Sequence, residues 1–428
     1  METDNTLPEK KDPYIALRFP EFRAFLSMRF FLTFGYQIQA VVIGWYIYHL
    51  TKDPLSLGLI GLTEAIPSIG IALYGGYVAD KSEKTILLKS IMAGLFFCSL
   101  ILFLVTLPIL FERIGQKNII ILIYCMIFLI GIGRGFLGPV TFAVLGLIIP
   151  REHYPNSSTW NSTGWQIASI AGPAAGGLIY AYGGIAWTFF IVLILFSISF
   201  ASIFFLKKRL PQFVPKENIF DSLKAGINFV FSSKMLLGAL SLDLFSVFFG
   251  GAVALIPVIA SEVLKVGPEQ FGMMRAAPAV GAVLAMITMT RHSPMNRPWR
   301  NLLIAVTGFA LSIICYGLSR NFYLTLFFLF LEGTFDSISV IIRSTLMQLL
   351  TPDNMRGRVS AVNSMFIGSS NEIGAFESGL TARLMGTVPA VVFGGTMTLA
   401  IVSATYFKSK KLIPLGLHEI NPPAKAIG

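Results

Sequence analysis

The sequence predicts an all-α integral membrane protein with twelve transmembrane helices in two pseudo-symmetric six-helix bundles. Three observations predict it: the composition, a series of long apolar segments, and an internal repeat. Of the 428 residues, 54% are hydrophobic and only 13% are charged, and the mean hydropathy is +0.72. Soluble proteins carry about 25% charged residues, so the composition argues against an ordinary soluble enzyme. A disordered chain is excluded, because 37 Phe side chains must be buried.

The apolar segments have the length of membrane helices, which need about 20 predominantly apolar residues. Each is a continuous run, without the alternating ten-residue pattern of membrane barrel strands. The polar N-terminus lacks the short apolar core of a secretory signal, so the first segment is expected to stay in the mature protein. The expected spans are 24–50, 55–79, 86–110, 118–149, 157–181, 184–206, 235–262, 269–291, 300–318, 322–350, 359–384 and 387–407.

The distribution of Lys and Arg between the spans predicts the orientation. If the N-terminal segment 1–23 is cytoplasmic, the inside segments, including the tail 408–428, carry 23 Lys and Arg, and the outside gaps carry five. Cations accumulate on the cytoplasmic side. Both termini are therefore expected in the cytoplasm, in a multi-pass protein of the plasma (inner) membrane. The net charge of +11 then reflects topology, and no nucleic-acid partner is expected.

The longest gap, 207–234, divides the chain into one bundle at 24–206 and a second at 235–407. The gap begins with three consecutive cations and contains two prolines. Its second part predicts an amphipathic helix on the inner leaflet, with Asn218 as the cap. The apolar face of this helix would carry Phe220, Leu223, Ile227 and Phe231.

The two halves repeat each other. When 128–177 is shifted by 202 residues, ten pairs are identical, among them Gly131/Gly333, Gly172/Gly374 and Gly177/Gly379. A second match, at a shift of 214, pairs Pro54 with Pro268 and Gly58 with Gly272. Because six spans separate the equivalents, both copies keep the same direction in the membrane. Parallel repeats of this kind are typical of a transporter whose halves rock about a central site.

One loop motif predicts the family. Between the second and third spans the chain reads Gly76-Tyr-Val-Ala-Asp-Lys-Ser-Glu-Lys84. This resembles the signature loop of the major facilitator superfamily, with Gly76, Asp80, Lys81 and Lys84 matching and Glu83 standing where the family usually has Gly. The resemblance implies that this region latches the two halves together on the cytoplasmic side. The alternative is a solvated loop carboxylate.

The fourth span carries Arg134, with Gly138 four residues later. This pair resembles the superfamily's helix 4 motif, which is associated with proton transfer. An arginine inside a membrane span is expensive and usually faces a cavity or a partner. A structural ion pair is the alternative.

The fifth span resembles the superfamily's antiporter motif, which ends in Gly-Pro, two residues, and Gly-Gly. Symporters of the superfamily generally lack this motif, so the resemblance implies export rather than uptake. Small residues of this kind permit close helix packing, and ordinary packing is the alternative role. The motif residues are Gly164, Gly172, Pro173, Gly176 and Gly177.

The second half resembles one bacterial branch of the superfamily, which contains enterobactin exporters and macrolide efflux pumps. The resemblance is strongest in residues 240–380, around Asp243 and in the stretch 351–379. It does not identify the substrate.

In the superfamily fold, spans 1, 4, 7 and 10 line a central cavity. Arg134 and Asp336 are related by the 202-residue shift, so they are expected at similar depth and could pair across the cavity. Asp243 or Asp336 is expected to be the coupling carboxylate, since a buried carboxylate can exchange protons near neutral pH. The alternative is that both are permanently ionised structural partners. The expected substrate and proton pathway comprises Gln37, Gln39, Arg134, Asp243, Glu332, Asp336 and Arg343.

A second set of charges is expected nearer the outside. Glu64, Arg275 and Glu377 each lie roughly 9–12 Å below the outer surface, by the rise of a helix. Arg275 is expected to bridge to one or both glutamates and close an outer gate. Packing within each half is the alternative.

These observations predict a proton-coupled exporter of moderately lipophilic small molecules. Its partners would be the lipid bilayer, the substrate and protons, and the chain is expected to act as a monomer. No metal, cofactor or covalent chemistry is implied, because no phosphate-binding loop or zinc motif occurs. A nutrient symporter or an uncoupled facilitator is the alternative. An intramembrane enzyme is disfavoured, since the four histidines fall in or beside loops, and a receptor role would leave the buried charges unexplained.

Overall fold

The computed structural model describes residues 14–208, 219–291, 294–352 and 355–416. These residues form helices and turns, with no β-strand among them, in agreement with the predicted class. Inside these ranges, the side chains left out of the description are those of 72–73, 76–77, 79–81, 151, 155, 219–223, 290–291, 356–357, 360–361, 364 and 369.

Prolines begin several helices of the N-terminal half. The first residue of α1 (Pro20–Thr51), α2 (Pro54–Lys81) and α4 (Pro108–Ile114) is a proline, which suits a first turn because no intrahelical partner there needs its missing N–H. The side chain of Asp53 caps α2 by accepting a hydrogen bond from the backbone N–H of Leu55, at 3.1 Å. The other helices of this half are α3 (Lys84–Val105), α5 (Gln116–Ile148) and α6 (Tyr154–Ile203).

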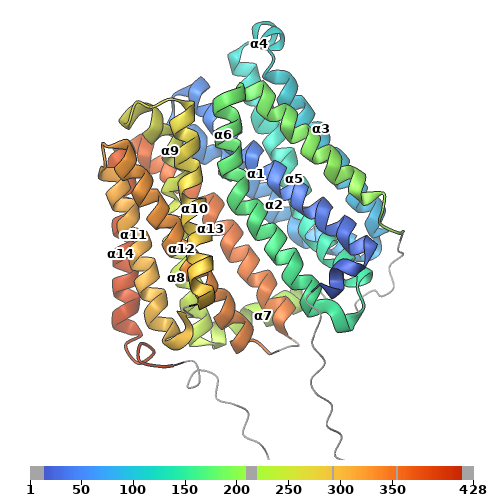
Figure 1. Cartoon of the computed structure of the whole chain (residues 1–428), viewed down its shortest axis with the longest axis vertical. Coiled ribbons are helices and arrows are strands. Elements are labelled where there is room, and N and C mark those ends of the chain that lie inside the picture. Colours follow the sequence, from blue (N-terminus) through green and yellow to red (C-terminus); the bar gives the residue numbers. More distant parts are fainter. Residues whose placement is uncertain (1–13, 209–218, 292–293, 353–354, 417–428) are drawn as a thin grey trace, which may run out of the picture.

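α6 is 50 residues long and contains two spans. Gly184 interrupts its helical backbone with φ 74° and ψ −177°, a conformation that glycine adopts without a steric penalty. The chain turns back at this residue, and the two arms of α6 are visible in Figure 1. The predicted boundary between the fifth and sixth spans is confirmed to within two residues.

The C-terminal half contains the last six predicted spans. The first of these, the seventh of the chain, differs from expectation. The predicted helix over 235–262 is divided into α8 (Lys234–Phe249), a 3-10 turn, a short α-helical piece and a π turn that ends at Val263. Two sequence features explain the division. Gly251 lies against α13, where a Cβ would be 2.8 Å from the backbone of Gly374, and Pro257 has no N–H to donate. The remaining helices are α10 (Pro268–Arg291), α11 (Pro298–Leu318), α12 (Phe322–Leu350), α13 (Arg356–Met385) and α14 (Thr387–Lys408).

Ten helical segments of the described chain are long and apolar enough to cross a membrane. α6 counts once among them although it has two arms, and α13 has the length, at 30 residues, but is too polar to be counted. With both added, the helices give the twelve predicted crossings. The third predicted span is shorter than expected, because α3 ends at Val105 and Pro108 starts the separate helix α4.

The linker between the halves contains α7 (Ile219–Ser232), as its amphipathic pattern predicts. Val230 is fully buried in a cluster with Leu240 of α8 and Val359 of α13. Phe231 is exposed and is free to contact lipid. The predicted cap Asn218 and the side chains of Phe220 and Leu223 lie outside the described residues.

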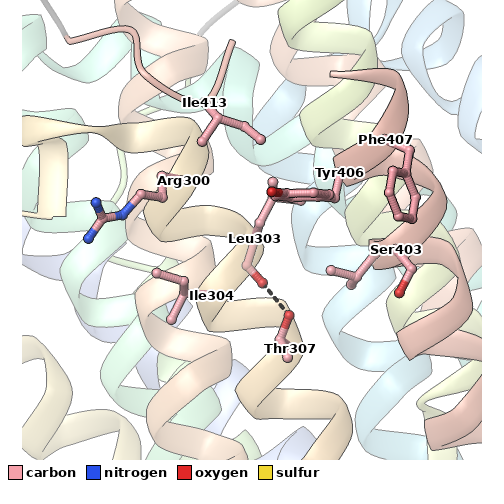
Figure 2. Close-up of a pocket in the computed structure, with 9 residues that line it drawn as sticks. Arg300, Leu303, Ile304, Thr307, Ser403, Tyr406, Phe407 and Ile413 are labelled. Atoms are coloured by element: carbon pink, nitrogen blue, oxygen red, sulfur yellow. Dashed lines mark hydrogen bonds between the residues drawn. The ribbon is translucent and has the colours of Figure 1, made fainter. Parts of the chain in front are cut away.

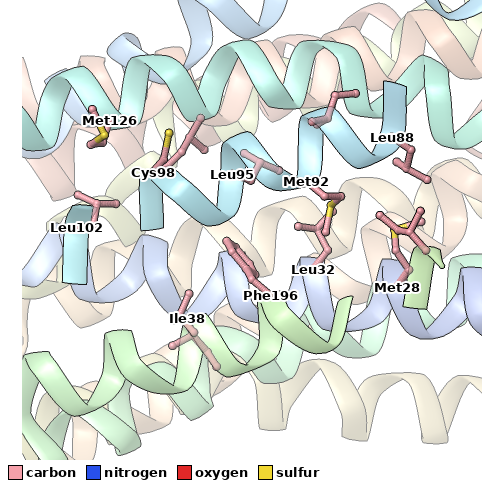
Figure 3. Packing of buried hydrophobic residues seen from close by; sticks show 14 of the residues in the cluster. Met28, Leu32, Ile38, Leu88, Met92, Leu95, Cys98, Leu102, Met126 and Phe196 are labelled. Carbon is pink, nitrogen blue, oxygen red and sulfur yellow. The ribbon is translucent and has the colours of Figure 1, made fainter. Parts of the chain in front are cut away.

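Both described ends of the chain lie at the same end of the bundle (Figure 1). We call it the termini end, and the other the opposite end. The core of the N-terminal half lies among α1, α3, α5 and α6; Figure 3 shows Leu32 of α1 beside Met92 of α3 and Phe196 of α6. Inside a bilayer, such packing rather than the exclusion of water holds helices together.

The internal repeat appears as equivalent close contacts between helices. A Cβ on Gly131 of α5 would lie 2.5 Å from the carbonyl oxygen of Glu64 in α2, and one on Gly333 of α12 would lie 2.1 Å from that of Pro278 in α10. Only glycine permits these approaches. The α2–α5 pair of one half and the α10–α12 pair of the other are therefore packed in the same way.

Candidate functional site

Glycines bring the two halves into contact at the opposite end. A Cβ on Gly177 of α6 would lie 2.6 Å from the Cα of Gly272 in α10, and one on Gly379 of α13 would lie 2.9 Å from the backbone nitrogen of Gly58 in α2. The two contacts are equivalent under the repeat, because Gly177 matches Gly379 and Gly58 matches Gly272. The halves are thus joined by two related backbone-to-backbone crossings.

Side chains support the same closure. Trp45 of α1 packs on Phe271 of α10, with ring centroids 4.2 Å apart. The hydroxyl of Tyr48 donates a hydrogen bond to Glu262, and Arg383 of α13 forms an ion pair with Asp53 at 3.4 Å. These contacts lie where the helices turn at the opposite end. In the described state, the space between the halves is therefore closed at that end.

A charged cluster lies between the halves, below this closure. We call Tyr36, Glu64, Arg134 and Glu372 the Arg134 cluster. Arg134 of α5 forms an ion pair with Glu64 of α2 and donates to the hydroxyl of Tyr36 in α1 at 2.7 Å. That hydroxyl donates to Glu64 Oε1 at 2.5 Å. Glu372 of α13, from the other half, approaches the same guanidinium nitrogen at 3.5 Å.

Close helix packing positions this cluster. Gly131 and Gly135 of α5 lie against the α2 backbone at Glu64 and Ser68, so α5 and α2 approach closely enough for Arg134 to reach Glu64. The Tyr36 ring lies under the guanidinium, with 4.6 Å from its carbon to the ring centroid, a favourable cation–π distance. One cation thus has two carboxylates, one from each half.

The Arg134 cluster is partly exposed. The side chain of Arg134 is 37% accessible and that of Glu372 is 25% accessible, whereas Glu64 is at 9%. With both carboxylates ionised the cluster carries a net charge of −1, and with one proton bound it is neutral. Because a buried net charge is unfavourable, this arrangement can hold and release a proton without leaving Arg134 unpaired.

A second cluster lies within the C-terminal half. Asp243 of α8 forms an ion pair with Arg343 of α12, and both side chains are 8% accessible. Arg343 also donates through Nε to the carbonyl oxygen of Ser339, at 3.3 Å. Asp336, two helical turns before Arg343, interacts electrostatically with both members of the pair. Asp243 and Arg343 thus have the ion-pair geometry of structural partners.

The expected cross-cavity pair of Arg134 and Asp336 is not formed. The repeat places the two residues at equivalent positions of α5 and α12, but each interacts with a charged residue of its own half. Arg134 pairs with Glu64, its neighbour through the α2–α5 packing, and Asp336 interacts electrostatically with Arg343 and Asp243. Equivalent depth in two halves does not bring side chains together across the space between them.

The expected outer gate is not formed either. Arg275 donates to the carbonyl oxygen of Val253 at 3.4 Å and interacts electrostatically with Glu332 of its own half. Glu377 accepts a hydrogen bond from Thr381, one turn on in α13, at 2.8 Å. Glu64 belongs to the Arg134 cluster instead. Packing within each half, the stated alternative, describes Arg275 and Glu377 in this structure.

The remaining pathway and motif residues have different surroundings. Gln39 is buried in the N-terminal half, where it accepts a hydrogen bond from Ser99 of α3 at 2.6 Å, so it does not line the space between the halves. Gln37 packs against Gly172, and Gly176 packs against Ile38. Gly164 lies near Leu26, and Pro173 stands inside α6. The glycines of the antiporter-like motif therefore allow α6 to pack closely against α1 and, at Gly177, against α10.

Of the four residues that match the signature loop, Lys84 is the one whose side chain is described. It is buried, and it lies with Glu21 and Lys207 around a small hollow within the N-terminal half. The side chains of Asp80 and Lys81 lie outside the described residues. The predicted latch at this loop therefore stays a prediction.

Glu372 is the site residue that the sequence interpretation missed. It lies seven residues before Gly379, which is close to two helical turns, so both face α2. Glu377, which was chosen instead, is five residues away and points about 140° around the helix. The small residues Ala375 and Gly379, which pack against Gly61 and Gly58, are the signal that could have identified the Glu372 face.

We expect the variant Arg343→Ala to be strongly destabilised, because it leaves Asp243 as an uncompensated buried charge, an effect of about 3–5 kcal/mol. Adding Asp243→Asn should recover part of the loss. The midpoint of thermal unfolding in detergent measures both, and Arg320→Ala, at an exposed cation, is the control. An unchanged midpoint in Arg343→Ala would show that the pair is not structural.

A comparison with known protein families decides the classification. The model of the transmembrane secretion effector family matches residues 11–417. The chain belongs to this family. It is a member of the major facilitator superfamily, in the branch of the enterobactin exporters, as the motifs suggested. The chain is therefore a membrane transporter of the multi-pass inner-membrane type, and it is not an enzyme.

Relatives and solved structures agree with this assignment. The enterobactin exporter EntS of Shigella flexneri is 26% identical over 389 residues, covering 89% of this chain and 90% of the relative. EntS of Escherichia coli strain K12 is 25% identical over 409 residues, with 91% and 94% covered. The POT family transporter PepTSo has a TM-score of 0.69 at 11% identity, with 92% and 98% covered. A bacterial homologue of the human lysosomal transporter Spinster, inward-facing and unoccupied, has a TM-score of 0.65 at 13% identity, with 92% and 98% covered. The two solved structures share the fold of this secretion effector.

Proposed function

We propose that this secretion effector is a proton-coupled exporter of moderately lipophilic small molecules, of the siderophore or drug type, and that it works by alternating access. The observation that carries the proposal is the Arg134 cluster. A single guanidinium is shared between Glu64 of its own half and Glu372 of the other half. A change of protonation there alters a contact between the two halves.

Closure at one end supports alternating access. The Gly177–Gly272 and Gly58–Gly379 crossings close the opposite end. If the termini are cytoplasmic, as the excess of cations predicts, this is the state that loads substrate from the cytoplasm. Opening the opposite end requires both crossings and the Arg134–Glu372 contact to separate. This fits the rocking of two repeats about a central site.

The Arg134 cluster supports proton coupling. A proton on Glu372 removes the charge that attracts Arg134 across the halves, while Glu64 keeps the arginine compensated. A proton arriving from outside would therefore loosen the contact between halves without stranding a buried charge. Asp336 and Asp243 are the second candidates for this role, with Asp336 favoured because Asp243 is already paired with Arg343.

The substrate class rests on the relatives and on the side chains near the cluster. The matching relatives are enterobactin exporters, and the Gly-Pro motif of α6 resembles that of antiporters. The rings of Phe30 and Phe34, which stack with centroids 5.8 Å apart, offer an apolar surface on α1, the helix that also carries Tyr36. Apolar walls with a few placed polar groups are typical of small-molecule sites.

The test uses the purified protein in proteoliposomes with a lumenal pH dye and an imposed pH gradient. Catecholate siderophores, macrolides and cationic dyes are added one at a time. We expect at least one class to collapse the gradient, because an antiporter exchanges protons for substrate. Labelled substrate that crosses without proton flux would instead indicate an uncoupled facilitator, and substrate moving together with protons would indicate a symporter.

A further inference from the structure

A groove on the outer surface of the C-terminal half is not explained by transport between the halves. It has a volume of about 360 Å³ and lies between α11 and α14 at the termini end. α11 and α14 are neighbours at the edge of the bundle, away from the N-terminal half (Figure 1). The groove therefore faces the surrounding bilayer.

The walls of the groove are apolar and its rim is polar. Leu303 and Ile304 of α11 and Val402 of α14 line it, and Tyr406 stands over it (Figure 2). Thr307 and Ser403 satisfy their hydroxyl donors within their own helices, with bonds of 2.7 and 2.8 Å to the carbonyl oxygens of Leu303 and Leu399. The interior can thus accept a hydrocarbon chain without leaving a polar donor unpaired.

The segment after α14 forms the roof of the groove. The indole N–H of Trp299, at the start of α11, donates to the hydroxyl of Ser409 at 2.8 Å. This bond holds the following turn against the start of α11. Ile413, from that turn, closes the groove at the termini end (Figure 2). The groove is therefore built by three parts of the chain rather than by a chance gap between two helices.

Among the described residues of the two helices and the turn that form the groove, every charged side chain is positive. Arg300 lines it at the rim, with its side chain extending outward (Figure 2). The stretches 294–318 and 387–416 contain no Asp or Glu. Further exposed cations stand at the same ends of the two helices, namely Arg297, Lys408, Lys410 and Lys411.

We propose that the groove binds one anionic phospholipid of the leaflet at the termini end, with an acyl chain along Leu303, Ile304 and Val402 and the phosphate at Arg300 and Tyr406. The anionic head group complements the five cations of the described stretches 294–318 and 387–416, which contain no carboxylate. A zwitterionic lipid offers the same acyl chains but no net charge to this rim. Basic pockets between transmembrane helices are a recognised way of binding anionic head groups. The inference does not depend on the proposed transport function.

The test compares lipids of the same acyl chains by native mass spectrometry of the delipidated, full-length protein in detergent. We expect one phosphatidylglycerol to bind more tightly than phosphatidylcholine. Arg300→Gln should weaken the binding of phosphatidylglycerol about fivefold, which is the contribution of one cation near an anionic membrane surface. Ile304→Trp, which fills the groove and keeps every cation, should remove the preference. Arg320→Gln, at the opposite end, is the matched control.

Three results would overturn the proposal. Equal binding of the two lipids by the unchanged protein would remove the basis for an anionic ligand. Full retention of phosphatidylglycerol by both Arg300→Gln and Ile304→Trp would place the lipid elsewhere. Displacement of phosphatidylglycerol by an equal concentration of inorganic phosphate would mean that the rim binds free anions and that the acyl groove contributes nothing. Thermal unfolding of each variant checks that it is folded, and transport activity is not needed for any of these measurements.

Discussion

Glu372→Gln is expected to abolish substrate-driven proton flux while the protein remains folded. The amide cannot take up a proton, so the cluster loses the step in which the contact between halves changes its charge. Folding should survive because Glu64 still compensates Arg134 and the Glu372 side chain is one-quarter accessible. The proteoliposome assay with a lumenal pH dye measures the flux, and we expect it to fall to the level of empty vesicles.

Glu377→Gln is the matched control for this prediction. It makes the same chemical change in the same helix, five residues away, at a carboxylate whose described hydrogen bond is to Thr381 of its own helix. Its proton flux should be close to that of the unchanged protein. Full flux in Glu372→Gln would assign coupling to another carboxylate, and Asp336→Asn would be the next variant to measure.

Gly177→Ala is expected to hold the opposite end open. The new Cβ would stand 2.6 Å from the Cα of Gly272, whereas two carbons pack best at about 3.5–4.0 Å, so the crossing must widen by about 1 Å. Gly379→Ala should do the same at the equivalent crossing, and the double variant should have the largest effect. Spin labels at the exposed positions Glu112 and Arg320 measure the separation of the halves at this end, in a background without the three native cysteines.

We expect the mean distance between these labels to increase and transport to fall, because the closed state becomes less populated. Gly94→Ala is the control, since a Cβ at Gly94 in α3 meets no atom within 4 Å. An unchanged label distance in the double variant would show that the crossings tolerate a methyl group, and the closure would then have to depend on other contacts.

The helices could be predicted because each depends on a continuous stretch of sequence. Apolar runs of membrane length located the spans, and most predicted ends lie within a few residues of those observed. The seventh span could not be predicted in detail. Its division depends on the approach of α13 to Gly251, which is a contact between distant parts of the chain.

The candidate site was predicted only in part. The depth of each charged residue can be inferred from the sequence, whereas its pairing partner depends on how the helices pack. Depth in the membrane drew attention to Arg134, Glu64 and Asp243, which the structure places in ion pairs. Their pairing depends on which way each helix face turns, and this is determined by glycine contacts such as Gly131 against Glu64. Glu372 was overlooked for the same reason. Its importance follows from the face it shares with Gly379 rather than from the residues next to it.

Gly184 and Gly386 make the same kind of turn in the two halves. They are related by the 202-residue shift, and each joins two antiparallel spans through a single residue with φ of 74° or 90°. Exposed loop tips are where proteases cut most readily, and these two connections offer almost no loop. A protease added on the side of the opposite end should therefore leave both hairpins uncut. The sidedness of the chain is better mapped there by labelling single introduced cysteines than by searching for cleavage fragments.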